Sequence, residues 1–133
     1  MINVLDSSAT IAFFYNEKGA DVVENVLLDK QNDCFIHAIN LCEVYYDALR
    51  RTSEAEAEKI VADLVAAGVI IREDFDQMFW KEVGRLKARY RASLADFCGV
   101  VLTNKLGGTF LTADHHEFDK LALDSVCSIQ FIR

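Results

Sequence analysis

Two segments decide the fold prediction: Ile-Asn-Val-Leu-Asp at residues 2–6 and Thr-Phe-Leu-Thr-Ala-Asp at residues 109–114. Each begins with a short, mostly apolar run, which is typical of a strand buried inside a parallel sheet, and each ends in an aspartate. Similar apolar runs occur elsewhere in the chain. We therefore predict five strands, at residues 2–5, 34–37, 69–71, 109–112 and 127–132.

Apolar residues at helical spacing fill the intervals between these strands, and helix-capping residues mark several boundaries. Ser53-Glu54-Ala55-Glu56 and Ser93-Leu94-Ala95-Asp96 have the spacing of capping boxes, and Gly107-Gly108 is a helix stop. The predicted helices cover residues 7–14, 20–28, 40–51, 54–67, 75–91, 93–105 and a short stretch from about residue 115. Alternating strands and helices predict an α/β fold with three α/β/α layers around a mainly parallel five-stranded sheet.

Length and composition favour one folded domain over residues 1–133. Of these residues 52% are hydrophobic, and no apolar run approaches the ~18 residues that span a bilayer. The amino terminus has no basic region of the kind found in signal peptides. We therefore expect a cytoplasmic protein that does not associate with a membrane. The cysteines have no close Cys-x-x-Cys pair, so buried free thiols are expected rather than disulfides or a zinc site. They are Cys34, Cys42, Cys98 and Cys127.

Acidic residues are the candidates for chemistry. In open α/β sheets, functional sites lie beyond the carboxyl ends of the strands, which is where Asp6 and Asp114 are expected. Asp96, in a first helical turn, and Glu43, one turn into its helix, are positioned to reach the same edge. Because converging carboxylates repel one another, such a set needs cations, and oxygen ligands favour Mg²⁺ or Mn²⁺.

Each of these acids also has a purely structural interpretation. Asp96 lies in the capping box that Ser93 begins, and Asp114 begins a second one, Asp114-His115-His116-Glu117. Asp6 is placed to cap the helix that follows it, and Glu43 lies off the apolar stripe of its helix, as a solvated side chain would. Spacing alone leaves both interpretations open.

Basic residues are concentrated in one segment, although the net charge is −7, with 14 Lys and Arg against 21 Asp and Glu. An acidic balance is unusual for a nucleic-acid-binding protein. Within residues 81–91 there is a single acid, and the segment is either a solvated helix face or a contact for a phosphate backbone. The candidate RNA-binding residues are Arg85, Lys87, Arg89 and Arg91.

Four fragments, in order along almost the whole chain, resemble the PIN-domain family and, within it, the VapC-type toxin ribonucleases. They are Val-Leu-Asp-Ser-Ser-Ala (4–9), Ile-Asn-Leu-Cys-Glu-Val (39–44), Leu-Ala-Asp-Phe (94–97) and Leu-Thr-Ala-Asp (111–114).

This resemblance implies an endoribonuclease that depends on Mg²⁺ or Mn²⁺ and leaves a 5′-phosphate and a 3′-hydroxyl. It further implies a homodimer and a cognate antitoxin whose segment occupies the cleft. The catalytic and metal-binding residues carried over are Asp6, Glu43, Asp96 and Asp114. Ser7 matches a small hydroxyl residue after the first acid, and Thr112 matches a polar residue that supports the site or contacts phosphate.

The chain also departs from the family pattern. His115-His116-Glu117 follows the last acid, where many relatives carry a basic or small residue; we expect both histidines to be exposed. The alternative function is a PIN-like protein that binds protein or RNA with weak or no catalysis. A haloacid-dehalogenase phosphatase would need an aspartate at Ser8. A receiver-like phospho-acceptor would need a late lysine after a strand, but Lys105 and Lys120 lie in predicted helices.

Overall fold

The computed structural model describes residues 1–133 and contains five strands and seven helices. Strands and helices alternate along most of the chain, as predicted. The strands are β1 (Ile2–Leu5), β2 (Asp33–His37), β3 (Ile70–Arg72), β4 (Thr109–Thr112) and β5 (Ile129–Phe131). The helices are α1 (Ser7–Phe14), α2 (Ala20–Leu28), α3 (Ala38–Arg51), α4 (Glu54–Ala66), α5 (Gln77–Arg89), α6 (Leu94–Leu106) and α7 (Phe118–Leu123).

All strand pairs in the sheet are parallel, in the order β3-β2-β1-β4-β5. The predicted α/β class and the five-stranded parallel sheet are therefore confirmed. The first strand lies in the middle, between β2 and β4. The carboxyl ends of β1 and β4 are consequently neighbours although more than 100 residues of sequence separate them.

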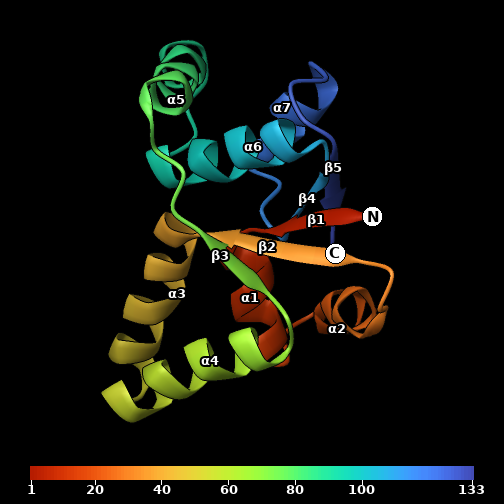
Figure 1. The fold of residues 1–133 in the computed structure, drawn as a ribbon, viewed down its shortest axis with the longest axis vertical. Helices are drawn as coiled ribbons and strands as arrows, with labels where there is room; N and C mark the ends of the chain where they lie inside the picture. Colours follow the sequence, from red (N-terminus) through yellow and green to blue (C-terminus); the bar gives the residue numbers. More distant parts are fainter.

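Helices cover both faces of the sheet, with α1 to α4 on one side and α5 to α7 on the other (Figure 1). Two hydrophobic cores result, one between the sheet and α1 to α4 and one between the sheet and α5 to α7. Side chains alternate along each strand, so Leu5 and Leu111 enter the former core while Val4 and Phe110 enter the latter. Each fully buried large side chain contributes roughly 1.5–3 kcal/mol of hydrophobic stabilisation. Burial on both faces explains why β1 and β4 are mostly apolar rather than alternating.

Most element boundaries agree with the predictions, and the differences have local causes. The helix predicted from residue 75 to 91 is shorter, because Asp76 caps it by accepting a hydrogen bond from the Phe79 amide and Tyr90 is extended. The last strand is also shorter than predicted. The final helix begins at Phe118 rather than near His115.

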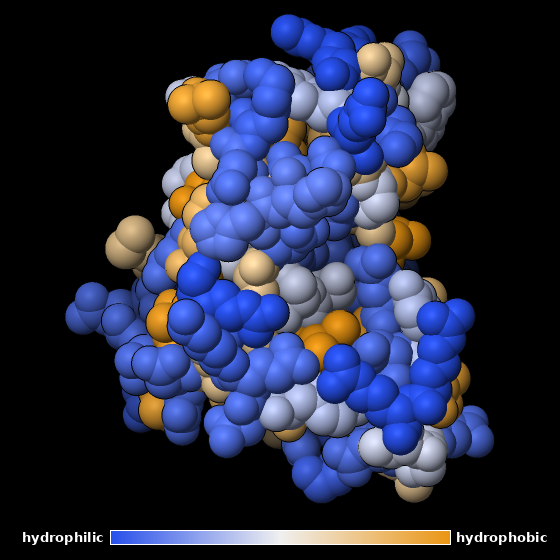
Figure 2. Space-filling model, turned by 180° about the vertical axis from the view of Figure 1, so that it is seen from behind, coloured by the Kyte–Doolittle hydropathy of each residue, from blue (hydrophilic) through white to orange (hydrophobic).

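The surface is mainly polar. On the face opposite to that of Figure 1, hydrophilic residues dominate and hydrophobic atoms form small groups (Figure 2). All four cysteines are free, as predicted, but Cys42 is exposed, so the expectation that all four are buried is wrong for this residue. None of the helices has the length and apolar character needed to cross a membrane.

Candidate active site at the carboxyl edge of the sheet

Asp6 immediately follows β1 and is 2% exposed. One carboxylate oxygen, Oδ1, accepts a hydrogen bond of 2.9 Å from the Ser7 amide, which makes Asp6 the amino-terminal cap of α1. The other, Oδ2, accepts hydrogen bonds of 2.7 Å from the hydroxyls of Ser8 and Thr112. The capping interpretation is therefore correct, and Asp6 is also hydrogen-bonded to β4.

Two hydroxyl groups connect the ends of β1 and β4. The Ser8 hydroxyl accepts a hydrogen bond of 3.0 Å from the Ala113 amide, and the Thr112 hydroxyl accepts one of 3.1 Å from the Asp114 amide. The two hydroxyls are 3.1 Å apart. These hydrogen bonds hold the backbone of residues 113 and 114 in a fixed position relative to the carboxylate of Asp6.

Asp114 is half-buried and stabilises a turn rather than a helix. Its Oδ1 accepts a hydrogen bond of 2.8 Å from the His116 amide. The capping box predicted from Asp114 to Glu117 is wrong, because the helix begins three residues later than the box requires and has no side-chain cap. Both histidines are exposed, as expected. His115 binds the Asp119 carboxylate and the carbonyl oxygen of Arg133.

Glu43 is half-buried on α3, so the expectation of a solvated side chain is wrong. Its Oε1 accepts a hydrogen bond of 3.0 Å from the Ser7 hydroxyl. Ser7 therefore donates its backbone amide to Asp6 and its hydroxyl to Glu43. Helix α1 begins with a residue that contacts both acids.

Asp96 lies in the first turn of α6 and forms the predicted capping box with Ser93. Its Oδ2 accepts a hydrogen bond of 3.0 Å from the Ser93 amide, and its own amide donates to the Ser93 hydroxyl at 3.1 Å. No bond occupies Oδ1. Capping and a role in an acidic site are therefore compatible for this residue, because each uses a different oxygen.

The pKa values show that these carboxylates share one electrostatic environment. Burial raises the pKa of Asp6 to about 7; the negative charges of Asp96 and Glu43 add to this rise, and the two hydroxyl hydrogen bonds oppose it. Burial also raises the pKa of Glu43 and of Asp96. The charge of Asp96 contributes at Glu43, and the charge of Asp114 contributes at Asp96. No lysine or arginine forms an ion pair with any of the four acids.

The residues fit a hard divalent ion that retains part of its hydration shell. No three His, Cys, Asp or Glu side chains are close enough to hold one ion together, so a closed site of the structural-zinc type is not formed. Mg²⁺ is ordinarily bound by one or two carboxylates and several waters. The oxygen donors of the four acids, their mutual repulsion and the missing counter-charge suit an ion of this class.

The basic residues predicted to bind RNA differ in how they are engaged. Arg85 forms an ion pair with Glu82 at 3.0 Å, and Lys87 donates to the Ala92 carbonyl oxygen at 2.8 Å. Arg89 and Arg91 are exposed and have no carboxylate partner. Arg91 is two residues before Ser93, the cap of the helix that carries Asp96.

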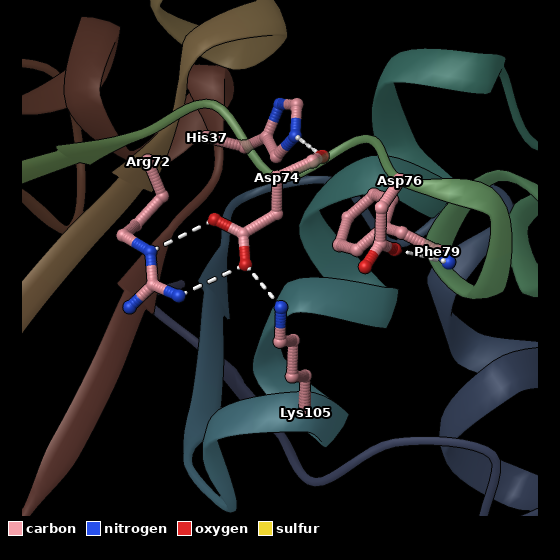
Figure 3. Close-up of polar contacts among 6 residues, drawn as sticks. All are labelled: His37, Arg72, Asp74, Asp76, Phe79 and Lys105. Atoms are coloured by element: carbon pink, nitrogen blue, oxygen red, sulfur yellow. Dashed lines mark hydrogen bonds and ion pairs between the residues drawn. The ribbon is translucent and has the colours of Figure 1, made fainter.

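Another aspartate that follows a strand has the opposite environment. Asp74, after β3, binds the guanidinium of Arg72 through two hydrogen bonds of 2.8 and 2.9 Å and the ammonium of Lys105 at 2.5 Å (Figure 3). Its backbone carbonyl oxygen accepts a hydrogen bond from His37. The bonds from Arg72 and Lys105 hold the pKa of Asp74 far below its usual range.

We call the carboxyl end of the sheet, where Asp6, Glu43, Asp96 and Asp114 lie, the acidic edge. Two residues there were not assigned a role from the sequence. Ser8 binds both Asp6 and the end of β4, but a serine after a strand has many possible roles, and its partners at the end of β4 are more than 100 residues away. Asn40 is buried and donates to the Ala95 carbonyl oxygen beside Asp96. The sequence feature that could have identified Asn40 is its position: a polar residue on the buried side of an amphipathic helix, one turn before Glu43.

The fold and this edge define a class of protein: a three-layer α/β/α protein with acidic side chains at the carboxyl ends of its central strands. The chain belongs to the PIN domain family, whose model matches residues 4–123. No match was found among curated protein sequences.

Solved structures with the same fold include proteins of VapBC systems. A chain of DNA-bound VapBC from Salmonella typhimurium is 15% identical, with a TM-score of 0.74, and the alignment covers 100% of this chain and 99% of that one. For VapBC2 from Rickettsia felis, bound to a promoter fragment, the identity is 14%, the TM-score 0.73 and the coverage 98% of both chains. Mycobacterium tuberculosis VapC20, described as a toxin that cleaves the sarcin-ricin loop, is 14% identical, with a TM-score of 0.70 and coverage of 86% and 91%.

Proposed function

We propose that this protein is an endoribonuclease that depends on Mg²⁺ or Mn²⁺ and uses Asp6, Glu43, Asp96 and Asp114. The observation that carries the proposal is the buried carboxylate of Asp6, which faces other acids, has no cationic partner and has a raised pKa. Strongly perturbed titratable groups of this kind are concentrated at functional sites. Membership of the PIN family supports the same conclusion.

The four residues have distinct tasks in this proposal. When bound by these residues, a divalent ion would supply a water of lowered pKa and positive charge for the reaction. Asp6, held by three hydrogen bonds, would be a rigid ion ligand, and Asp96 and Asp114 would complete the ligand set largely through water. Glu43 binds the ion or orients the attacking water, and Ser7 fixes its carboxylate. In-line attack would leave a 5′-phosphate and a 3′-hydroxyl.

The supporting residues complete the proposed site. The Ser7 hydroxyl binds the carboxylate of Glu43, and the Thr112 hydroxyl binds Asp6 and the amide of Asp114. Ser8 has a similar role, because its hydroxyl binds Asp6 and the hydroxyl of Thr112. For the RNA backbone, the contacts of the basic segment favour Arg89 and Arg91 over Arg85 and Lys87, because the latter two already have partners.

We infer the biological setting from the structural relatives. Two of them are described as a toxin–antitoxin complex and as a member of the VapBC family of toxin–antitoxin systems, so we propose that the chain, as one nuclease domain over residues 1–133, is the toxin of such a pair. An antitoxin partner, a homodimer and a cytoplasmic location belong to the same proposal.

Cleavage of a mixed RNA pool tests the catalytic proposal. Purified protein is assayed with Mg²⁺, with Mn²⁺ and with EDTA, beside Asp6→Asn and Asp96→Asn. The matched control is Asp21→Asn, which changes an exposed aspartate on α2. We expect cleavage by wild type and the control with either ion, none in EDTA, and a loss of roughly 10²–10⁴-fold in the two site variants. Full activity of folded Asp6→Asn would exclude this site.

The alternative is a PIN-like module that binds protein or RNA with weak or no catalysis; the net charge of −7 favours its protein-binding form, because an acidic balance is unusual for a protein that binds nucleic acid. Calorimetric titration with Mn²⁺ distinguishes the two functions. A nuclease should bind the ion through the acidic edge and lose this binding in Asp6→Asn. A binding module has no need of the ion, and wild-type protein that neither binds Mn²⁺ nor cleaves RNA would be assigned to that class.

A further inference from the structure

Asn40 lies in the first turn of α3, and its side chain is fully buried, at 0% exposure. Its Nδ2 donates a hydrogen bond of 3.2 Å to the carbonyl oxygen of Ala95. Glu43 is one turn further along α3, and Ala95 directly precedes Asp96 on α6. This hydrogen bond therefore connects the two helices that carry Glu43 and Asp96, within one turn of each carboxylate.

Gly99 makes room for this contact. A Cβ atom at Gly99 would lie 3.2 Å from the Asn40 Nδ2 and 2.5 Å from the Cε1 atom of the Phe110 ring. The amide of Asn40 and the ring of Phe110 thus occupy the space that a side chain on α6 would take. The close approach of α3 to α6 depends on glycine at this position and on a side chain of the size of asparagine opposite it.

The stability of the fold does not explain why this side chain is polar. The Oδ1 atom of Asn40 is buried and has no hydrogen-bond partner. An unpaired buried acceptor is destabilising, and an apolar side chain at this position would remove that cost. Leucine has the same branched arrangement of four heavy atoms in its side chain. An asparagine that makes one hydrogen bond and leaves one acceptor unpaired therefore points to a role in geometry.

The geometry in question is the separation of two acids that repel each other. Glu43 and Asp96 carry like charges on α3 and α6, so the two carboxylates oppose a close approach of their helices until a cation lies between them. The bond from Asn40 to Ala95 holds the helices together at the end where this repulsion acts.

We propose that Asn40 is a positioning residue that sets the separation of Glu43 from Asp96, and thereby the affinity of the acidic edge for its divalent ion. The proposal rests on the function proposed above, because it concerns the same site. Asn40 itself contacts neither ion nor substrate; it acts through the helices that carry the two ligands.

The test compares Asn40→Leu with Thr103→Val. Thr103 is also fully buried on α6, and its hydroxyl donates to the Gly99 carbonyl oxygen at 2.8 Å, but this bond lies within one helix. Calorimetry measures the Kd for Mn²⁺, and thermal unfolding in EDTA measures stability without the ion. RNA cleavage is measured at limiting and at saturating Mn²⁺.

We expect Asn40→Leu to raise the Kd for Mn²⁺ about tenfold, the scale found when residues that orient ligands are removed. Its thermal stability in EDTA should equal or exceed that of wild type. Cleavage should fall at limiting Mn²⁺ and recover at saturation, with an unchanged KM for RNA. Thr103→Val should bind Mn²⁺ like wild type. If Asn40→Leu does not fold, Asn40→Ala removes the amide without adding volume, and the same rise in Kd is expected.

Other results would overturn the inference. A folded Asn40→Leu that binds Mn²⁺ as tightly as wild type would show that Asn40 does not set the site, while the proposed nuclease function would stand. Equal losses of affinity in Asn40→Leu and Thr103→Val, each in proportion to lost stability, would assign Asn40 a purely structural role. Wild-type protein that binds no Mn²⁺ and cleaves no RNA would reject the proposed function, and this inference with it.

Discussion

Asp6 and Asp74 both follow strands of the same sheet, yet their surroundings are opposite. Asp74 binds Arg72 and Lys105, and its side chain is 11% exposed (Figure 3). Asp6 is more deeply buried, binds only neutral donors and faces other acids. The pKa of Asp74 is accordingly far below its usual range, whereas that of Asp6 is raised to about 7.

In its ionised form, Asp74 stabilises the fold, whereas ionised Asp6 destabilises it. Asp74 has its counter-charges within the chain, so its interactions are complete. Asp6 lacks a counter-charge, and its environment favours the protonated form until a cation arrives from solution. The contrast between these two carboxylates can be tested by varying the pH and by substituting each aspartate in turn. Varying the salt concentration extends the test to the basic residues.

The largest expected effect is a loss of Mn²⁺ affinity in acid. Because an ion must displace the proton that Asp6 holds near neutrality, the apparent affinity should fall by up to about tenfold per pH unit below 7. Calorimetry in buffers of different ionisation enthalpy measures both the affinity and the released proton. Asp74→Asn, as the matched control, should keep this pH dependence. An affinity that is constant from pH 5 to 8 would contradict the assignment of Asp6.

The next effect is a loss of stability in Asp74→Asn, by about 1–2 kcal/mol, because two partly solvated cations lose their partner. A lowered pKa means that the stabilisation is present above the unfolded pKa of about 3.9 and is lost as pH falls through the still lower folded value. Urea unfolding at pH 7 and pH 3 should therefore show a difference from wild type that shrinks in acid. Cleavage of RNA per folded molecule should not change; a large loss would place Asp74 in the active site.

The sign is reversed for Asp6→Asn in the absence of metal. A raised pKa means that the contribution to stability is fully present below about pH 4 and is lost as pH rises through about 7. A neutral side chain avoids this loss, so Asp6→Asn should be more stable than wild type by about 1 kcal/mol at pH 8 in EDTA. Urea unfolding at pH 8 and pH 5 measures the difference, which should be smaller at pH 5. A less stable variant at both pH values would show that the hydrogen bonds to Asp6 outweigh its burial.

The smallest expected effect concerns RNA binding by the basic residues, which also differ in whether they have a partner within the chain. Arg89 and Arg91 have no carboxylate partner, whereas Arg85 binds Glu82 and Lys87 binds a carbonyl oxygen. Changing both free arginines to glutamine should reduce the salt dependence of RNA binding by about 0.7 in log–log slope for each lost phosphate contact. Fluorescence anisotropy with inactive Asp6→Asn as the background measures this slope. The double variant of Arg85 and Lys87 is the matched control, and a larger change there would reverse the assignment.

The fold was largely predictable because its signals are local. The apolar runs of β1 and β4 and the helix over residues 20–28 were predicted with the observed bounds, since a strand buried on both faces and an amphipathic helix have distinct patterns. The capping serines Ser53 and Ser93 also begin the predicted helices. The error at α7 arose where Asp114 hydrogen-bonds to the nearer amide of His116 instead of capping a helix.

The arrangement of the acidic edge was less accessible, because it depends on contacts between distant parts of the chain. Sequence patterns indicated the four acids, and their catalytic use remains a prediction. Nothing local indicates that Ser8 bonds to the end of β4, or that Asn40 reaches Ala95. The half-burial of Glu43 was missed for the same reason: its partner Ser7 is 36 residues away. Helical periodicity describes one helix at a time, not what another helix places beside it.

The position of β1 between β2 and β4 has a consequence for the order of synthesis. A ribosome produces Asp6 first, but the hydroxyl of Thr112 and the backbone that places Asp114 arrive more than 100 residues later. At roughly 5–20 residues per second, a growing chain spends several seconds with β1 as an exposed edge strand and its first acid unsupported. The acidic edge therefore cannot assemble on an incomplete chain. Any product that stops before residue 109 would lack it, whatever the fold of its amino-terminal half.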